Sequence, residues 1–310
     1  MELTFFPDFF IIGAPRCGTT SLSRYLSAHP NICFSRPKEP HYFSTLASEA
    51  GPAVLQRDYL EQFFSHYQAG YEAVGEGSVS YLYAPHAIDR ILALNPDAKF
   101  IAMLRNPIDM IYSFHYRMLF TMDEDVREFS RAWALQEARA RGRSIPRRCR
   151  DPRLLQYAAV GKLGAQVARF MAKVRENHRM IILFDDFLAD TCAAYRNVLS
   201  FLGVSDDGRR EFPPKMVSKT YRFSWLQRWL YRPPKPLMDA LAASKRRQSM
   251  GGSEKASGAM GLRKRLVRFN TIKQKPAPLE ASMREMLRET FAEDIARLGS
   301  LIGRDLHHWR

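Results

Sequence analysis

Hydrophobic residues in this chain fall into short apolar runs that alternate with stretches of helical periodicity. Four runs bounded by turn residues have the length of buried strands, and they lie at 9–12, 71–75, 97–104 and 179–184. Between and after them, apolar positions recur every three or four residues, which predicts amphipathic helices at 21–28, 58–67, 154–174 and 279–298. Strands that alternate with helices indicate an α/β fold with a central, mostly parallel sheet and helices on both faces.

The first apolar run leads into a turn bracketed by two glycines and then into small hydroxyl residues. The stretch reads Phe9-Phe10-Ile11-Ile12-Gly13-Ala14-Pro15-Arg16-Cys17-Gly18-Thr19-Thr20-Ser21-Leu22. A strand, loop and helix in this order point backbone N–H groups and the positive end of the helix dipole at an anion. The stretch therefore predicts a site for phosphate or a similar group. A tight turn without a ligand is the alternative.

The spacing from Gly13 to Gly18 is that of a Walker A loop, but the residues after it differ. That motif needs lysine and then Ser/Thr after its second glycine, whereas Thr19-Thr20 follow here. A loop without the lysine is poorly equipped for nucleoside triphosphate chemistry. The cation of this loop is Arg16, and a degenerate P-loop kinase that needs magnesium and a carboxylate to hold it stays as an alternative.

The stretch from Gly13 to Leu22 closely resembles the 5′-phosphosulfate loop of sulfotransferases that use 3′-phosphoadenosine-5′-phosphosulfate (PAPS). In that family the position of Arg16 is commonly lysine, and arginine is a familiar variant. The resemblance implies a three-layer, P-loop-NTPase-like fold. It also implies a donor site that leaves adenosine 3′,5′-bisphosphate as product, requires no metal, and is formed by Arg16, Cys17, Gly18, Thr19, Thr20 and Ser21.

A second cluster combines a carboxylate and an imidazole in the segment Ser35–Phe43, which two prolines hold extended. Residues i and i+2 of an extended segment point the same way, so Glu39 and His41 can share one cleft. A surface turn with a solvated Lys-Glu pair is the alternative. In sulfotransferases of the heparan-sulfate and bacterial type, a Lys-Glu-x-His-(Phe/Tyr)-Phe segment follows the anion loop. That resemblance implies Glu39 as the catalytic base, with His41 as the second candidate.

The third apolar run ends in Arg105-Asn106-Pro107, where Asn caps a helix and Pro takes its first position. Arg105 then lies at the carboxyl end of a strand, where open parallel sheets bind ligands. Taken alone, this is a common helix entry. With Ser113 eight residues after the arginine, it resembles the family's 3′-phosphate motif and implies that Arg105 and Ser113 contact that phosphate. Lys273 and Lys275 fall where relatives often supply a basic loop to the same group.

One departure from the family concerns the acceptor. Relatives that act on heparan chains typically show Glu-Lys-(Thr/Ser)-Pro where this chain has Glu76-Gly77-Ser78-Val79. Gly77 and Val79 thus replace the lysine and the proline, which weighs against a heparan-like polysaccharide. The acceptor is expected to carry a hydroxyl or an amine on a carbohydrate, a lipid or a small molecule.

Positive charge is concentrated in two places. Residues 219–275 carry fifteen Lys/Arg against Asp239 and Glu254, a net of +13 out of the chain's +15. This segment is interpreted first as a lid over donor and acceptor, because bacterial relatives carry a comparable insertion. Its aromatic residues 222–232 allow peripheral membrane contact as the second interpretation, and a nucleic-acid patch is the third. Residues 139–153 hold seven arginines and predict a solvated, mobile loop, with acceptor contact as the alternative.

The cysteines and the apolar runs bear on the cellular compartment of the protein. Cys17, Cys33, Cys149 and Cys192 show no metal-ligand spacing, so reduced thiols are expected, and Arg16 with the helix terminus is expected to lower the pKa of Cys17. No basic n-region and no apolar run of about 18 residues occurs, which favours a cytoplasmic location.

Together these features predict one sulfotransferase domain over residues 1–310 with the insertion at 219–275. It would move a sulfuryl group from PAPS to an acceptor by in-line displacement, with Glu39 or His41 as base and Arg16 as a fixed electrophile. No nucleic acid is expected as partner. A non-catalytic basic protein that binds membranes or nucleic acid remains the alternative outside the enzymes.

Overall fold

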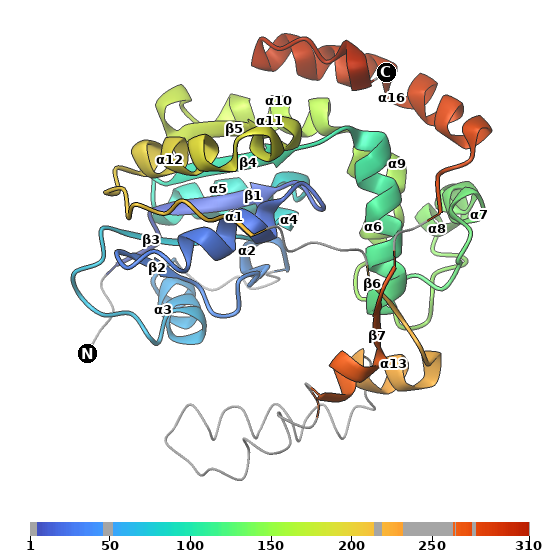
Figure 1. The fold of residues 1–310 in the computed structure, drawn as a ribbon, viewed down its shortest axis with the longest axis horizontal. Coiled ribbons are helices and arrows are strands. Elements are labelled where there is room, and N and C mark those ends of the chain that lie inside the picture. Colours follow the sequence, from blue (N-terminus) through green and yellow to red (C-terminus); the bar gives the residue numbers. More distant parts are fainter. Residues whose placement is uncertain are drawn as a thin grey trace. The chain divides into compact units, whose positions relative to one another are not determined.

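The computed structural model of the chain describes residues 5–45, 52–213, 219–231, 263, 265–274 and 277–309 (Figure 1). The chain divides into two compact units. The first comprises Met1–Met110, Val160–Met216 and Arg284–Arg310, and the second comprises Ile111–Ala159 and Val217–Met283. The single domain with a basic insertion at 219–275 stays a prediction.

The first unit is built on a parallel sheet of five strands. They are β1 (Phe9–Gly13), β2 (Ile32–Phe34), β3 (Ala73–Glu76), β4 (Lys99–Leu104) and β5 (Arg179–Leu183), in the order β2-β3-β1-β4-β5. The predicted parallel sheet is confirmed. Strand β2 was not predicted, because three apolar residues between Asn31 and Ser35 are too short a run to separate a strand from a loop.

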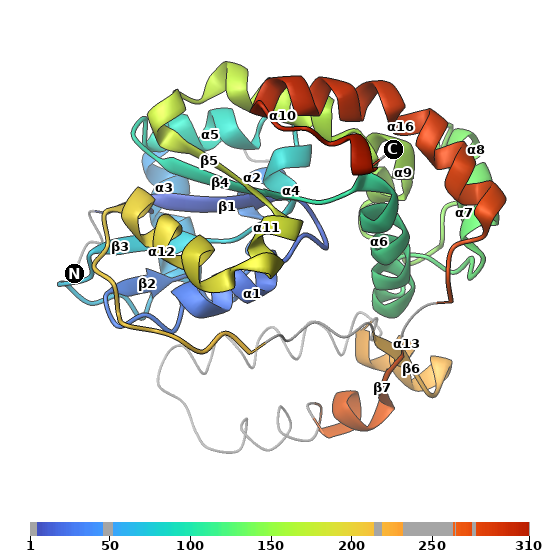
Figure 2. The same ribbon diagram turned by 45° about the horizontal axis from the view of Figure 1, so that its top comes forward.

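Alternate side chains of β1 pack on opposite faces of the sheet. The Phe10 ring contacts Phe43 of α2 (Tyr42–Thr45) and Tyr81 of α4 (Ser80–Tyr83). Beside it, Phe100 of β4 contacts Phe170 of α10 (Leu163–Lys173), so α2, α4 and α10 cover one face. On the other face lie α1 (Thr19–Leu26) and α12 (Thr191–Leu202), as Figure 2 shows. The predicted helices on both faces are therefore confirmed.

Further helices occur in both units of the described residues. They are α3 (Pro52–Phe63), α5 (Ala87–Leu94), α6 (Pro107–Thr121), α7 (Phe129–Ala134), α8 (Gln136–Ala140), α11 (Phe184–Ala189), α13 (Ser224–Tyr231) and α16 (Ala281–Ile302), with short 3-10 turns η2 (Glu176–His178) and η3 (His307–Trp309). The helix expected at 58–67 thus begins earlier and ends at Phe63. Helix α16 buries the predicted apolar stripe of Met283, Leu287, Phe291, Ile295 and Leu298.

The single helix expected over 154–174 is wrong. The segment forms η1 (Pro152–Leu155), α9 (Tyr157–Gly161) and α10, and Ala159 is exposed rather than buried. Gln136 contributes to the interruption before α9: its side-chain oxygen accepts from the N–H of Ala158 at 2.6 Å, and its carbonyl accepts from the side chain of Gln156 at 3.0 Å. The bond from Ala158 takes the place of a helical one, so the periodic apolar pattern continues although the helix is interrupted.

The second unit contains a small antiparallel pair, β6 (Lys219–Tyr221) with β7 (Thr271–Lys273), and helix α13. It also corrects the expectation of a fully solvated arginine loop at 139–153. Arg139 and Glu124 are fully buried and joined by two hydrogen bonds of 2.7 Å, and Tyr157 donates to the same carboxylate at 2.8 Å. Arg139 is therefore part of the core of this unit, because its charge is completely paired there.

None of the helices in the described residues is both long enough and apolar enough to cross a membrane.

Candidate active site

The strand order brings the loop after β1 and the ends of its two neighbouring strands to one edge of the sheet. Because the sheet is parallel, all five strands end at the same edge, and β1 lies between β3 and β4. The loop after β1 is therefore flanked by Glu76 and Gly77 at the end of β3 and by Arg105 at the end of β4. Ligands of open parallel sheets bind at this edge.

The loop after β1 leaves the first turn of α1 open to an anion. Gly18 precedes the helix with φ of 88°, and no described side chain caps the turn, which also holds no acidic residue. A Cβ at Gly18 would lie 3.0 Å from the Phe184 ring, so glycine is required both by the conformation and by the space. An uncapped helix start of this kind presents backbone N–H groups and positive charge to a bound anion.

The predicted donor residues of this loop differ in exposure. Arg16, Thr20 and Ser21 are partly exposed, whereas Cys17 and Thr19 are buried. The lowered pKa expected for Cys17 is wrong, because burial raises the pKa of its thiol to about 12 and outweighs the nearby charges of Arg105 and Arg16. Cys17 can thus contribute its backbone N–H but not a thiolate.

Arg105 meets the anion loop on the ring of Phe184, the first residue of α11. Its guanidinium carbon lies 4.9 Å from the centre of that ring, and the same ring borders Gly18. The Arg105 side chain also lies 3.8 Å from the carboxylate of Asp109, which accepts a hydrogen bond from Arg284 at 3.2 Å. The two predicted phosphate contacts are therefore neighbours across one aromatic side chain.

The predicted helix entry after Arg105 is confirmed. The side-chain oxygen of Asn106 accepts from the N–H of Ile108 at 3.0 Å, and Pro107 is the first residue of α6. The Asn106 amide in turn donates to the carbonyl of Trp309 at 3.2 Å. The C-terminal turn η3 thus braces the strand end that carries the arginine.

Asp185 and Asp186 lie in the first turn of α11 and pair with residues near the C-terminus. Asp185 accepts from the Trp309 indole at 3.1 Å, and Asp186 forms a bidentate pair with Arg304 at 2.8 and 3.1 Å. The Arg304 hydrogen bonds hold the pKa of Asp186 below its ordinary value. Both carboxylates therefore bind the C-terminal residues to α11.

Glu39 and His41 come together as the i, i+2 spacing predicts. Their side chains approach to 3.8 Å, and the Lys38 ammonium donates to the other Glu39 oxygen at 2.8 Å. The backbone of His41 has φ of 55°, its N–H donates to Ser78, and its Nδ1 lies 2.8 Å from the Ser80 hydroxyl. About a third of each side chain is exposed, so a substrate can reach both groups.

Glu76 is a buried carboxyl that the sequence did not single out as a functional group. Tyr59 donates to it at 2.5 Å, and its other oxygen has no hydrogen-bond partner in the described structure. Burial raises its pKa to about 7, against the opposing effects of Tyr59, Tyr81, Ser78 and Lys38. The Glu76 position next to Gly77 was visible in the sequence, but its burial was not.

Gly77 leaves the room that Lys38 occupies. A Cβ there would lie 2.7 Å from the Ser23 hydroxyl and 3.2 Å from Cε of Lys38. Position 77 thus carries no lysine, but the Lys38 side chain passes next to it and binds Glu39.

Three predicted site residues lie outside the described part of the first unit. Ser113 on α6 and Lys273 on β7 belong to the second unit, where Ser113 is partly exposed and Lys273 is exposed. Lys275 lies outside the described residues. Their contacts with a donor stay predictions. Within the described ranges no three His, Cys, Asp or Glu residues cluster as metal ligands would.

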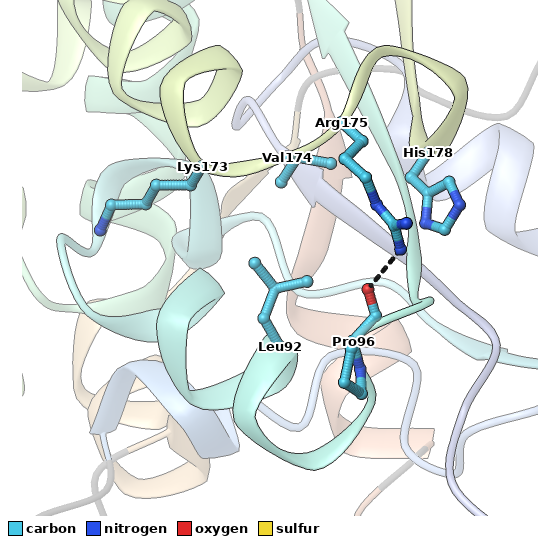
Figure 3. Close-up of a pocket in the computed structure, with 6 residues that line it drawn as sticks. All are labelled: Leu92, Pro96, Lys173, Val174, Arg175 and His178. Carbon is cyan, nitrogen blue, oxygen red and sulfur yellow. Dashed lines mark hydrogen bonds between the residues drawn. The ribbon is translucent and has the colours of Figure 1, made fainter.

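A hollow of about 380 Å³ lies at the opposite edge of the sheet (Figure 3). It is lined by Leu92, Pro96, Lys173, Val174, Arg175 and His178, and the Arg175 guanidinium donates to the Pro96 carbonyl at 3.3 Å. Pro96 and His178 precede β4 and β5, so this hollow marks the amino ends of the strands and is separate from the candidate site.

Known proteins give a consistent picture. The crystal structure of a sulfotransferase from Alicyclobacillus acidocaldarius is similar over 99% of this chain and 100% of that chain, with 30% identity and a TM-score of 0.67. Carbohydrate sulfotransferase 15 of Mus musculus is 31% identical over 147 residues, covering 34% of this chain and 26% of the relative. The bifunctional heparan sulfate N-deacetylase/N-sulfotransferase 1 of Caenorhabditis elegans is 31% identical over 113 residues, covering 36% and 13%.

The chain thus matches about a quarter or less of the length of these two curated relatives. Residues 6–222, which include the anion loop, Glu39 and Arg105, match the sulfotransferase domain family. Since that match spans more than half of the chain, the protein belongs to the sulfotransferase family.

Proposed function

We propose that this protein transfers a sulfuryl group from PAPS to a hydroxyl or amine of an acceptor. The observation that carries the proposal is the meeting of Gly18 and Arg105 on the Phe184 ring, within a domain of the sulfotransferase family. One loop supplies backbone N–H groups at an uncapped helix start, and an arginine stands beside it. This arrangement suits a nucleotide with phosphates at both its 5′ and 3′ positions.

The loop would bind the 5′-phosphosulfate. The N–H groups at the start of α1 are directed at an anion, and the first turn holds no acidic residue to repel one. Arg16 adds a permanent charge and can bond two oxygens, but it cannot shuttle a proton. Arg105 would bind the 3′-phosphate, together with Ser113 and the basic residues Lys273 and Lys275.

Glu39 would act as the general base. It accepts the acceptor's proton while the acceptor oxygen or nitrogen forms a bond to sulfur, and the bond from sulfur to the 5′-phosphate oxygen breaks with its electron pair on that oxygen. Lys38 binds one Glu39 oxygen at 2.8 Å, and the other Glu39 oxygen lies 3.8 Å from His41. Arg16 and the loop N–H groups stabilise the charge that builds on the leaving oxygen.

His41 is the second candidate for the base. Its Nδ1 pairs with the Ser80 hydroxyl, which directs the other ring nitrogen to the Glu39 side. If Glu39 is the base, Glu39→Ala lowers turnover by about 100-fold or more, and His41→Ala has the smaller effect. Full turnover in Glu39→Ala with loss in His41→Ala assigns the role to His41.

The acceptor proposed is a carbohydrate or a small molecule with a hydroxyl or an amine, and a lipid acceptor stays open. The relatives named above are a carbohydrate sulfotransferase and a heparan sulfate N-sulfotransferase, which supports the first class. Gly77 in place of lysine still argues against a heparan-like chain. Transfer of radiolabelled sulfate from PAPS across a panel of saccharides, amines, sterols and phenols tests the proposal, with Arg16→Ala expected to lose about 100-fold in rate.

A binding experiment tests donor recognition without the acceptor. Calorimetry with adenosine 3′,5′-bisphosphate and with adenosine 5′-monophosphate measures the contribution of the 3′-phosphate in wild type and in Arg105→Ala. We expect the wild type to prefer the bisphosphate by at least about ten-fold and the variant to lose most of that preference. Equal affinities in the wild type would refute the assignment of Arg105.

The same experiment separates the alternatives. A degenerate kinase would bind ATP with magnesium in preference to the bisphosphate, and a non-catalytic basic protein would bind neither. Metal-independent transfer is part of the proposal, and unchanged activity after treatment with a chelator is its test. The cytoplasmic location and the role of residues 219–275 as a lid stay predictions, which cell fractionation and deletion of 233–262 with donor-affinity measurement address.

A further inference from the structure

Helix α13 of the second unit exposes aromatic side chains on its outer face. Leu226, Gln227 and Leu230 are buried, so they form its inner side. The outer side carries Trp225, which is 68% exposed, and Trp229, which is 47% exposed, four residues apart on one helical face. A helix that covers a core normally turns polar residues outward.

Two neighbouring residues enlarge this aromatic face. Phe223 is 45% exposed and its ring lies 6.4 Å from that of Trp225, while Phe269, 55% exposed, stacks on Phe223 at 6.3 Å. Together with Leu226, Leu266 and arginines 148 and 228, these rings line a groove of about 680 Å³. We refer to Phe223, Trp225, Trp229 and Phe269 as the aromatic platform.

Buried hydrogen bonds hold the aromatic platform in place. Asn270 is fully buried, accepts from the N–H of Phe223 at 2.9 Å and donates to the Gln227 side chain at 3.0 Å. Gln227 also donates to the Phe120 carbonyl of α6 at 2.6 Å. Exposure of the rings is therefore a property of an ordered scaffold, and Figure 2 shows α13 beside β6 and β7 of the same unit.

The charge around the platform has one sign. Residues 219–231, 263 and 265–274 contain no Asp or Glu, whereas arginines 222, 228, 265 and 268 of these segments are exposed. The Arg222 guanidinium lies 5.4 Å from the centre of the Phe269 ring. A surface that combines Trp and Phe with arginine is complementary to a partner that is apolar inside and anionic outside.

We propose that the aromatic platform docks this protein on the surface of a lipid bilayer that contains anionic headgroups. Trp225, Trp229 and the two phenylalanines would enter the boundary between headgroups and acyl chains, where amphipathic rings are favoured. Arginines 222, 228 and 268 would pair with the anionic headgroups. This proposal is independent of the proposed transfer activity, because the platform residues are not part of the anion loop or of the Glu39 cluster.

The aliphatic surface beside the rings favours a bilayer over a nucleic acid. Phe223 and Phe269 lie nearly parallel, with ring centres 6.3 Å apart. Ile272, which is 36% exposed, and Leu266 add aliphatic surface next to the rings, which acyl chains match better than bases do. Each arginine near an anionic surface adds about five-fold in affinity, so several of them suffice for salt-sensitive, reversible binding.

Co-sedimentation with vesicles tests the proposal on the full chain. The probes are 100 nm vesicles of pure phosphatidylcholine and of phosphatidylcholine with 30% phosphatidylserine. We expect binding to the anionic vesicles to be at least about ten-fold tighter than to the neutral ones and to weaken as salt is raised. Tryptophan fluorescence should shift to the blue on binding and be quenched by brominated acyl chains.

Matched variants separate the platform from general charge and hydrophobicity. Trp225→Ser/Trp229→Ser and Arg222→Glu/Arg228→Glu should each weaken binding by at least about ten-fold. Leu188→Ala removes an exposed hydrophobe, 58% exposed, and Arg169→Glu reverses an exposed charge in the first unit, and both should bind like wild type. Circular dichroism and the melting temperature confirm that each variant is folded.

Three results would overturn the proposal. The first is equal binding of wild type to neutral and anionic vesicles. The second is unchanged binding in the tryptophan variant. The third is evidence that another partner covers the platform. Such evidence would be release of the protein from vesicles by a single-stranded oligonucleotide at a lower concentration than by free lipid. It would also be a dimer in sedimentation velocity that the tryptophan variant does not form.

Discussion

The buried carboxyl of Glu76 gives the most direct test of the electrostatics at the carboxyl edge of the sheet. The change is Glu76→Gln, which keeps the shape of the side chain and an oxygen that can accept from Tyr59 at the present 2.5 Å distance. It removes the ability to ionise and replaces one carboxyl oxygen with an amide NH2, and the second effect does not depend on pH. Any difference in pH dependence between the two proteins then reports the ionisation of this one group.

The expected magnitude follows from the two pKa values. Burial raises the pKa of Glu76 from 4.5 to about 7, so the folded protein holds a proton that the unfolded chain has released. Between pH 4.5 and 7 the unfolded state binds fewer protons, and the free energy of unfolding falls as pH rises. One pKa unit corresponds to about 1.4 kcal/mol, so the total loss is about 3 kcal/mol and no more is lost above pH 7.

Urea unfolding at pH 5, 6, 7 and 8 measures this effect. The free energy of unfolding of Glu76→Gln, relative to wild type, should increase over that range by between 2 and 3 kcal/mol, an order-of-magnitude figure. Glu72→Gln is the matched control, because Glu72 is exposed and hydrogen bonds, first that from the Ser205 backbone, lower its pKa. Its stability relative to wild type should stay constant from pH 5 to 8. Parallel profiles for wild type and Glu76→Gln would refute the assignment of a raised pKa.

Three further changes test the described structure. Arg139→Leu should lower the free energy of unfolding, measured with urea, by about 3–5 kcal/mol, because it leaves the Glu124 carboxylate buried without its cation. A loss under about 1 kcal/mol would contradict the buried pair. Iodoacetamide at pH 8 should modify Cys17 far more slowly than Cys192, since Cys17 is buried and burial raises the pKa of its thiol to about 12. Mass spectrometry of the peptides measures the two rates, and equal rates would contradict the burial of Cys17. Gly18→Ala should lower both the melting temperature and the affinity for adenosine 3′,5′-bisphosphate, because alanine is strained at φ of 88° and contacts a ring; two unchanged values would show that the loop is more open.

The sequence predicted three strands of the sheet from their apolar runs. Residues 9–12, 100–104 and 180–184 are continuously apolar, and β1, β4 and β5 follow from them. It could not predict β2, because a three-residue strand has too little pattern of its own and is stabilised by pairing with β3. The broken helix at 154–174 failed for the opposite reason: the pattern was periodic, but the side chain of Gln136 competes for the backbone.

At the site, local spacing was a better guide than electrostatics. The Asn106 cap follows from its neighbours, and Glu39 and His41 approach each other as expected, although His41 leaves the extended conformation with φ of 55°. The pKa of Cys17 was predicted in the wrong direction, because a sequence shows nearby charges but not the loss of water around a thiol. Burial depends on residues that are distant in the chain, so its effect on a pKa could not be predicted from the sequence.

Phe184 shows how such distant residues complete a site. It follows β5, the edge strand, and comes more than 160 residues after Gly18 and almost 80 after Arg105, so no local pattern connects the three. The sheet order brings the ends of β1, β4 and β5 together. The Phe184 ring then fills the space beside Gly18 and contacts the Arg105 guanidinium. A smaller side chain at 184 would remove both contacts at once. The spacing between the two predicted phosphate contacts therefore depends on a hydrophobic residue that lies between them.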